Sequence, residues 1–243
     1  MIGLIGGTSE SRAIAHRLSS ANYPWAATVV SPAATRLYKG LPGQVRVGPL
    51  DAAELRNWCQ ACGIRALIDA SHPFATVISR QAIATGLPYL RFERPVIPLS
   101  PPAESLADLD SLFQPDYLAH RRVLITLGSK ALPRFVEWQG RSHLFARILP
   151  TAYSQAQQSG FTPDRLICGS PATDPVIEQA LWQHLRLDTV VTKASGSAGG
   201  VPLKLELAKA LGVRLLVIAR PPMSYPRMTH RIDVAIAFCQ EVL

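Results

Sequence analysis

The chain has 243 residues, of which 48% are hydrophobic and 7% aromatic, and it carries a formal net charge of +8. This suffices for a sizeable aliphatic core, or for two smaller ones. No apolar run approaches the roughly 18 residues needed to cross a bilayer. The positive charge is dispersed, with no run beyond Arg121-Arg122, which disfavours a nucleic-acid binder and favours small polyanionic ligands. With no basic leader after Met1, we expect a cytoplasmic protein.

Short apolar runs, which predict strands, alternate with amphipathic stretches, which predict helices. The strands predicted in the first part of the chain are 2–5, 26–30, 44–47, 66–70 and 88–92. The helices predicted there are 9–20, 52–62 and 76–85, and the connection 31–41 allows one more short helix.

Five prolines then fall between positions 95 and 115, which indicates a linker or surface excursion. Beyond it the predicted strands are 122–126, 144–148, 165–168, 189–192 and 214–218, and the predicted helices are 132–138, 175–185, 202–211 and 234–242. Strands that alternate with helices favour parallel sheets. We therefore predict an α/β protein with two Rossmann-like parallel-sheet domains facing a central cleft. The expected parts are an N-terminal NADP-binding domain at 1–96, a Pro-rich linker at 97–119 and a C-terminal α/β domain at 120–243.

A glycine-containing loop, Gly6-Gly7-Thr8-Ser9-Glu10, follows the first predicted strand and opens the first predicted helix. Glycines let a backbone approach a phosphate, and free N–H groups at a helix start bind anions. Gly6, Gly7, Thr8 and Ser9 are therefore candidate cofactor-binding residues. The alternative is an ordinary strand-to-helix turn with a hydroxyl cap, because the spacing is not the full G-x-G-x-x-G.

The end of the second predicted strand indicates which nicotinamide cofactor fits. NAD-binding folds carry an acidic residue there, and this chain has none between Val30 and Asp51. Ser31 and Arg36 suit a 2′-phosphate instead, which favours NADPH. The alternative for Arg36 is a solvated surface charge.

The stretch Asp69-Ala70-Ser71-His72-Pro73 follows the fourth predicted strand. In open α/β sheets ligands bind at that edge. Asp69 and Ser71 share one side of the strand and are candidate cofactor-binding residues, whereas the turn at Pro73 redirects His72. His72 is a candidate for proton transfer and substrate binding, since imidazole titrates near neutral pH. Its alternative is a residue at a helix start.

Two arginines bracket the end of the fifth predicted strand in Leu90-Arg91-Phe92-Glu93-Arg94-Pro95. Arginine is well matched to carboxylates and phosphates, so Arg91 and Arg94 are candidate ligands for an anion. Pairing of Arg94 with Glu93 or another acid is the alternative.

The second half repeats the pattern of strand, glycine, hydroxyl and helix. It does so at Thr126-Leu127-Gly128-Ser129-Lys130 and in the small-residue loop 192–200. Such loops wrap a phosphate or lie against a flat ligand, unless they are floppy connectors.

Neither a metal site nor redox chemistry at the cysteines is expected. Cys59 and Cys62 form a C-x-x-C without a second pair, and their place near the end of a predicted helix favours two half-buried helix residues. The other histidines show no ligand spacing.

The chain resembles the precorrin-6A reductases and cobalt-precorrin-6A reductases of cobalamin biosynthesis. The resemblance spans nearly the whole length, and its most specific pieces are His72-Pro73-Phe74-Ala75 and Arg91-Phe92-Glu93-Arg94-Pro95. Further matching pieces are the loop at 6–10, Arg147-Ile148-Leu149-Pro150-Thr151 and Thr192-Lys193 with the glycine loop after it.

The resemblance implies a two-domain enzyme in which NADPH reduces one double bond of an anionic tetrapyrrole. It also implies that cationic and polar loop residues hold the carboxylates of the macrocycle. The candidate substrate-binding residues are His72, Arg91, Arg94, Thr126, Ser129, Arg147, Lys193, Ser195 and Gly196. A monomer or a homodimer is expected. The alternative function is a non-catalytic NADP-binding sensor or scaffold, which would bind nucleotide without the macrocycle. A sugar reductase or epimerase is less favoured, since no Tyr precedes a Lys by four residues.

Overall fold

The computed structural model describes residues 1–169 and 174–243 and divides the chain into two units. Unit 1 contains Met1–Pro95 and Pro221–Leu243, and unit 2 contains Val96–Arg220. Each unit is built on a six-stranded sheet in which every described strand pair is parallel. The predicted fold class, α/β with two Rossmann-like parallel sheets, is confirmed, while the cleft expected between them stays a prediction.

The strands of unit 1 are β1 (Ile2–Ile5), β2 (Trp25–Val29), β3 (Gln44–Val47), β4 (Ala66–Asp69), β5 (Tyr89–Phe92) and β12 (Met228–Thr229). Its helices are α1 (Ser9–Ser20), the 3-10 helix η1 (Pro32–Tyr38), α2 (Ala52–Ala61), α3 (Thr76–Ile83) and α8 (Ile232–Val242). The sheet order is β12-β5-β4-β1-β2-β3, so the direction of winding reverses between β1 and β4. The loops after these two strands therefore border the crevice at which open α/β sheets bind ligands.

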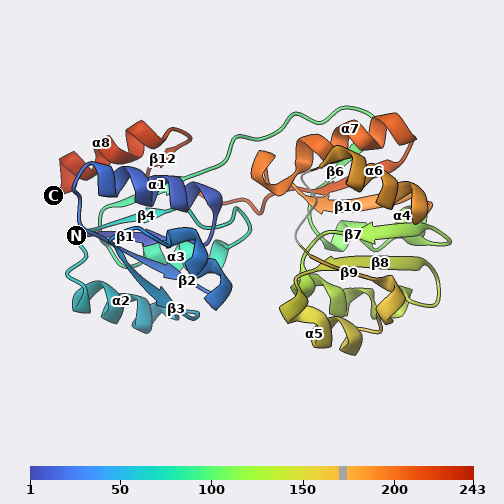
Figure 1. Ribbon diagram of the computed structural model, residues 1–243, viewed down its shortest axis with the longest axis horizontal. Helices are drawn as coiled ribbons and strands as arrows, with labels where there is room; N and C mark the ends of the chain where they lie inside the picture. The colour runs from blue at the N-terminus through green and yellow to red at the C-terminus, as the bar shows by residue number, and fades with distance from the viewer. Residues whose placement is uncertain (170–173) are drawn as a thin grey trace. The chain divides into compact units, whose positions relative to one another are not determined.

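Helices cover both faces of this sheet, as Figure 1 shows, with α1 and α8 on one face and α2 and α3 on the other. The strands are consequently apolar on both sides, as parallel sheets require. In β4, Ile68 packs into the core with α1 and α8, whereas its neighbour Leu67 packs into the core with α2 and α3.

The strands of unit 2 are β6 (Ala103–Leu106), β7 (Arg122–Ile125), β8 (His143–Ile148), β9 (Leu166–Cys168), β10 (Thr189–Lys193) and β11 (Arg214–Ile218). Its α-helices are α4 (Pro115–Leu118), α5 (Tyr153–Gln158), α6 (Pro175–His184) and α7 (Val201–Leu211). Its 3-10 helices are η2 (Asp110–Leu112), η3 (Ser129–Trp138), η4 (Pro150–Ala152), η5 (Pro163–Arg165) and η6 (Ser197–Gly199). The order β6-β11-β10-β7-β8-β9 has its reversal between β7 and β10, as in unit 1, but its edge strand β6 is the first strand of the unit in the chain, whereas β12 is the last strand of unit 1.

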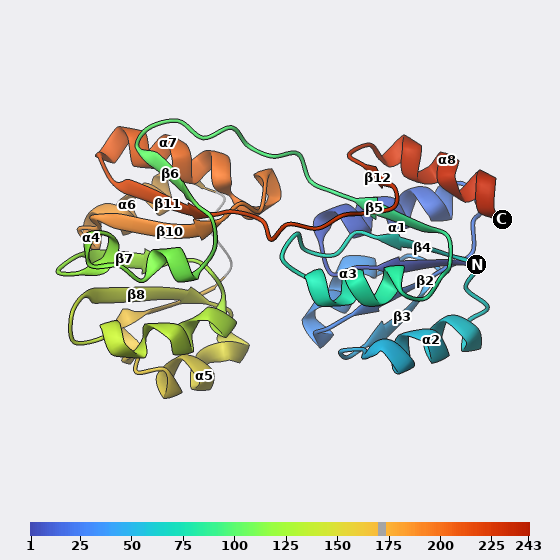
Figure 2. The ribbon, with the colours of Figure 1, turned by 180° about the vertical axis from the view of Figure 1, so that it is seen from behind.

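The division of the chain differs from the expected boundaries at 97–119 and 120–243. Residues 103–106, expected in a linker, form β6 and pair with β11 at the edge of the second sheet (Figure 2). At the other end, β12 pairs with β5 and α8 packs into the core of unit 1. The apolar pattern missed β6 because its sequence Ala-Glu-Ser-Leu is not an apolar run, and it missed β12 because that strand has only two residues.

Two further local predictions need correction. The helix expected at 132–138 is part of the 3-10 helix η3, which contains Pro133 and so lacks one backbone donor. The helix α5 follows the strand β8 and was not predicted. In the part of the chain that the structure describes, no helix is long and apolar enough to span a membrane.

Candidate functional site

The loop after β1 is joined to the loop after β4 at the reversal point of unit 1. Thr8 caps α1, because its Oγ1 accepts a hydrogen bond from the Ser11 N–H at 3.1 Å. The same Oγ1 donates to the carbonyl of Ala70 at 2.7 Å. Thr8 is buried, and its hydroxyl is already hydrogen-bonded within the protein, while its neighbours Gly7 and Ser9 are exposed. The predicted phosphate site is thus reduced to the backbone of Gly7 and the start of α1.

The two glycines of this loop are needed for different reasons. Gly7 has φ +96 and open space where a Cβ would lie, so a ligand can approach its backbone. At Gly6 a Cβ would lie 2.0 Å from Oη of Tyr38, which accepts a hydrogen bond from the Gly7 N–H and lies 2.6 Å from Oγ of Ser11. The packing of Tyr38 therefore explains Gly6 without a phosphate.

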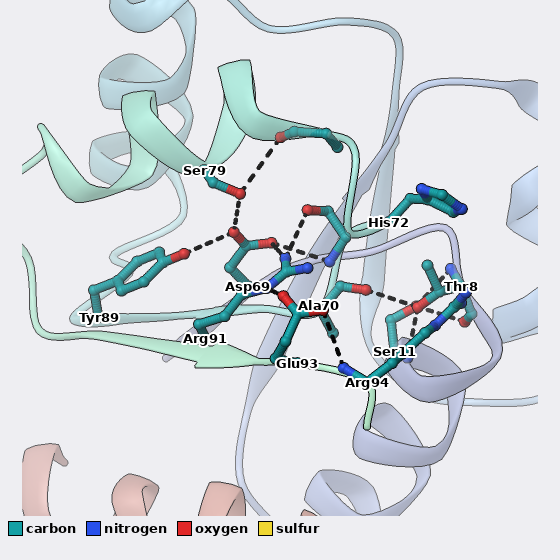
Figure 3. A network of polar contacts seen from close by, with 12 residues as sticks. Thr8, Ser11, Asp69, Ala70, His72, Ser79, Tyr89, Arg91, Glu93 and Arg94 are labelled. Carbon is teal, nitrogen blue, oxygen red and sulfur yellow. Dashed lines mark hydrogen bonds and ion pairs between the residues drawn. The ribbon is translucent and has the colours of Figure 1, made fainter. Parts of the chain in front are cut away.

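Asp69 lies at the centre of a fully buried polar network (Figure 3). Its Oδ2 accepts hydrogen bonds from Oγ of Ser79 at 2.5 Å and Oη of Tyr89 at 2.7 Å. Its Oδ1 accepts from Nη1 of Arg91 at 2.9 Å and the Ser71 N–H at 3.0 Å. Burial is the main reason that the pKa of Tyr89 is raised, so this phenol stays a donor. The carboxylate of Asp69 accepts hydrogen bonds from four protein donors, which favours a structural role for Asp69 over the predicted contact with the cofactor.

Arg91 and Arg94 are also held by carboxylates of unit 1. Arg91 is 1% exposed, and besides Asp69 its Nε donates to Glu93 at 2.8 Å and its Nη1 to Oγ of Ser71 at 3.0 Å. Arg94 donates to Glu10, in the first turn of α1, at 2.7 Å. Although burial raises the pKa of Glu10, hydrogen bonds led by that from Arg94 give a net lowering. The two arginines brace the reversal point, and the alternative expected for Arg94, a carboxylate partner, is the one observed in unit 1.

His72 belongs to the same turn but not to the Asp69 network. Its ring points away from Asp69 and Arg91 (Figure 3). Its Nδ1 accepts the Phe74 N–H at 3.2 Å, so a neutral ring carries its proton on Nε2. The side chain is half-buried. His72 thus lies at the edge of the sheet, where a proton-transfer residue is expected.

Ser31 and Arg36 lie beyond the end of β2, and both are exposed. Ser31 precedes η1 without using its hydroxyl as a cap, and Arg36 lies in the last turn of η1. No ion pair of Arg36 occurs among the described residues. Both side chains therefore fit a phosphate at the place where NADP-binding folds hold it.

In unit 2, the loops after β7, β8 and β9 line a pocket of about 370 Å³. Its lining residues are Thr126, Gly128, Ser129, Arg147, Ile148, Leu149, Thr151, Ala152 and Gly169. Thr126 itself donates to the carbonyl of Val191 at 2.8 Å, which ties β7 to β10. The structure brings together three predicted substrate residues, Thr126, Ser129 and Arg147, in this one pocket.

The small-residue loop after β10 is compactly folded. Ser195 is buried and its Oγ donates to the carbonyl of Lys193 at 3.2 Å. Gly196 has φ +73, and a Cβ at Gly199 would lie 1.8 Å from Oγ of Ser195. Burial, and secondly the charge of Lys130, lower the pKa of Lys193. The loop contains the 3-10 helix η6 and internal hydrogen bonds, so it is not an irregular connector.

Arg147 also belongs to a buried ionic cluster on one side of this loop. Its Nη1 and Nη2 donate to the two carboxylate oxygens of Glu178 at 2.8 Å each, and Nε1 of Trp182 donates to Glu178 at 2.8 Å. Lys204 is 3% exposed, and its Nζ donates to the carbonyl of Gly199 at 2.8 Å. Burial lowers the pKa of Lys204 to about 8, although Glu178 acts in the opposite direction.

Sequence reasoning missed the partners that hold the predicted residues. They are Tyr38, Ser79, Tyr89, Glu178 and Lys204. Glu93 was named as an alternative partner of Arg94, but its ion pair with Arg91 was not foreseen. Glu178 and Lys204 lie inside amphipathic helices, where a single charge is ordinarily solvated. The available signal was that each of these oppositely charged residues falls on the apolar face of its own helix, which indicates a buried charge with a partner.

The cysteines fit the interpretation drawn from their spacing. Cys59 is buried in α2 and Cys62 follows the last residue of that helix, partly exposed. Burial raises the pKa of the Cys59 thiol to about 11, so it is unreactive. Among the described residues, no group of three or more His, Cys, Asp and Glu side chains could hold a metal ion.

Comparisons with known proteins agree over the whole chain. The family model described as precorrin-6x reductase CbiJ/CobK matches residues 1–240. A cobalt-precorrin-6A reductase from Synechocystis sp. is 40% identical over 253 residues, covering 100% of this chain and 97% of the relative. One from Salmonella typhimurium is 33% identical over 235 residues, covering 90% and 86%. The solved structure "CobK precorrin-6A reductase" matches with a TM-score of 0.78 at 21% identity over 99% of this chain and 96% of that chain, which shows the shared fold.

Proposed function

The chain belongs to the precorrin-6x reductase family CbiJ/CobK and is an oxidoreductase, and from this premise we propose that it uses NADPH to reduce one double bond of the precorrin-6A macrocycle. The relatives from Synechocystis and Salmonella are both named for the cobalt-containing substrate, which favours cobalt-precorrin-6A. A cytoplasmic location and a monomeric or homodimeric state remain predictions.

The observation that carries the proposal is the open backbone at Gly7 beside the start of α1, at the reversal point of unit 1. The N–H groups of Gly7 and Ser11 are engaged by Tyr38 and Thr8, so those of Ser9 and Glu10 at the start of α1 are the donors proposed for a cofactor phosphate. Glu10 lies in the same turn, and its ion pair with Arg94 offsets its charge. The described residues therefore fit a dinucleotide at this loop.

Ser31 and Arg36 are proposed to select NADPH over NADH by binding the 2′-phosphate. We expect Arg36→Ala to raise the KM for NADPH on the order of tenfold, because a charge-assisted hydrogen bond is lost, and to leave that for NADH unchanged. Arg17→Ala is the matched control, since Arg17 is exposed on α1 away from this loop. An equal effect of Arg36→Ala on both cofactors would contradict the assignment.

NADPH supplies the hydride when it is bound, and the protein then has to orient the macrocycle and deliver one proton. His72 is the candidate proton donor through Nε2. We expect His72→Gln to lower kcat and to remove a pH dependence from it, while a binding role alone would raise KM.

The decisive experiment mixes the purified full-length protein with NADPH and either cobalt-precorrin-6A or the cobalt-free macrocycle. Stoichiometric oxidation of NADPH together with a change in the macrocycle spectrum is expected. Nucleotide binding without macrocycle binding would instead favour the sensor or scaffold alternative. No NADPH oxidation with either macrocycle would overturn the proposed activity.

A further inference from the structure

The ionic cluster in unit 2 contains more buried positive than negative charge. Arg147, on β8, and Lys204, on α7, are both buried. Glu178, on α6, forms an ion pair with Arg147, and its charge raises the pKa of Lys204 against the effect of burial. The two oxygens of Glu178 are already engaged by the guanidinium of Arg147. No second carboxylate pairs with Lys204 in the described part of the chain.

Lys204 occupies an unfavourable position for a cation. It lies in the first turn of α7, where the helix dipole repels positive charge. It is 3% exposed and close to the like charge of Arg147. A buried methionine of similar length would avoid these costs, so the lysine is expected to serve something other than stability.

The hydrogen bond of Lys204 shows what its ammonium group holds. Nζ donates to the carbonyl of Gly199, the last residue of η6 in the small-residue loop. A Cβ on Gly200 would lie 3.3 Å from the same Nζ, so the loop closes around the ammonium group. Gly200 also begins α7 without a side-chain cap. Lys204 therefore fixes the loop and places a positive charge beside it.

We propose that Lys204 is a positioning residue that tethers the loop 194–200 through Gly199 and supplies the positive charge with which this loop attracts a carboxylate of the substrate. The carboxylate would provide the counter-charge that the cluster lacks. The identity of the ligand rests on the function proposed above, whereas the tether rests on the contacts within unit 2.

The test compares Lys204→Met and Lys204→Gln with the wild type in the full-length protein. Lys204→Met removes both the donor and the charge. Lys204→Gln removes the charge but keeps an amide donor within reach of the Gly199 carbonyl. Lys209→Met is the matched control, because Lys209 is exposed on the same helix.

Three quantities are measured for each variant. The first is amide hydrogen exchange of the peptide that covers 194–200. The second is affinity for cobalt-precorrin-6A from quenching of tryptophan fluorescence, which needs no turnover. The third is the pair of KM values for the macrocycle and NADPH.

For Lys204→Met we expect exchange of this peptide and KM for the macrocycle each to rise on the order of tenfold, with KM for NADPH changed less than twofold. Lys204→Gln should restore the protection of the loop but not the affinity for the macrocycle. The Lys209→Met variant should match the wild type in all three measurements.

Exchange that is unchanged in Lys204→Met would overturn the tether. Faster exchange with unchanged macrocycle affinity would overturn the role of the loop in anion binding, while NADPH oxidation by the same variant would leave the proposed function intact. If the wild type binds the macrocycle but does not reduce it, the proposed function fails and the comparison of affinities still decides the inference.

Discussion

At the carboxyl edge of the sheet in unit 1, each buried arginine is matched by carboxylates of the same unit. Arg91 pairs with Asp69 and Glu93, and Arg94 pairs with Glu10. Among the described residues, the same edge of the sheet in unit 2 has one buried carboxylate, Glu178, for two buried cations. Two similar parallel sheets thus use buried charge differently. In unit 1 it braces the loops, and in unit 2 it leaves an excess that suits an anionic ligand.

The largest expected effect tests whether the buried ion pairs of Arg91 stabilise unit 1. We expect Arg91→Met to lower the free energy of unfolding by about 3–5 kcal/mol, because Asp69 is left as a buried charge without its partner. Urea unfolding followed by circular dichroism measures this loss. Arg80→Met, at an exposed position on α3, is the control and should change it by less than about 0.5 kcal/mol. A loss below about 1 kcal/mol for Arg91→Met would mean that the network is dispensable.

The excess charge in unit 2 predicts a pH dependence of stability. The pKa of Lys204 is about 8 in the folded protein and 10.5 for an ordinary lysine side chain, so the unfolded state binds more protons between these pH values. The free energy of unfolding therefore rises with pH in that window, by up to about 1.4 kcal/mol per pH unit. From pH 7 to pH 10 the wild type should gain about 2–3 kcal/mol relative to Lys204→Met. Denaturant unfolding at each pH checks this, and parallel curves for the two proteins would rule it out.

A third prediction concerns the glycine loop of unit 1, in which the packing of Tyr38 leaves no room for a Cβ at Gly6. Gly6→Ala should cost about 1–3 kcal/mol, since its Cβ would overlap the hydroxyl of Tyr38. In the Tyr38→Phe background the same substitution should cost clearly less. Thermal unfolding of the two single variants and the double variant closes the cycle. Equal costs in both backgrounds would show that Tyr38 does not impose this glycine.

The smallest expected effect is at the partly exposed pair of unit 1. Glu10→Gln should lower the free energy of unfolding by at most about 1 kcal/mol at neutral pH. The pKa of Glu10 is lowered in the folded state, so its contribution is present above the unfolded value of 4.5 and is lost as the pH falls. The difference between wild type and variant should accordingly vanish in acid. A difference that persists at low pH would point to lost packing instead.

Much of the fold could be predicted because ten strands are apolar runs separated by helices of clear period. Strands 2–5, 44–47 and 214–218 were predicted with the bounds that the structure has. The edge strands β6 and β12 could not be, because β6 is not an apolar run, β12 has only two residues, and the strands they pair with lie far away in sequence.

The sequence predicted which loops form the candidate site, but not which partners each residue in them would have. The sequence placed Asp69, Arg91 and Arg94 at one edge of a sheet, and they do meet there. It could not show that Ser79, Tyr89 and Glu93 would occupy them, since those contacts depend on how α3 and β5 pack. Arg147 was singled out through the family motif, while its partner Glu178 looked like any helix charge.

The return of the chain to unit 1 through β12 and α8 also affects how the molecule can be made and divided. Residues 96–220 form an uninterrupted unit, so a ribosome releases all of unit 2 before it completes unit 1. Until the last residues emerge, the N-terminal sheet lacks β12 beside β5 and lacks Ala235, Phe238 and Cys239 in its core. Truncation near residue 96 would yield a fragment with an open hydrogen-bonding edge and an uncovered apolar face, prone to self-association. A soluble version of that half requires the carboxyl-terminal 23 residues to be rejoined to it, as in a circular permutant.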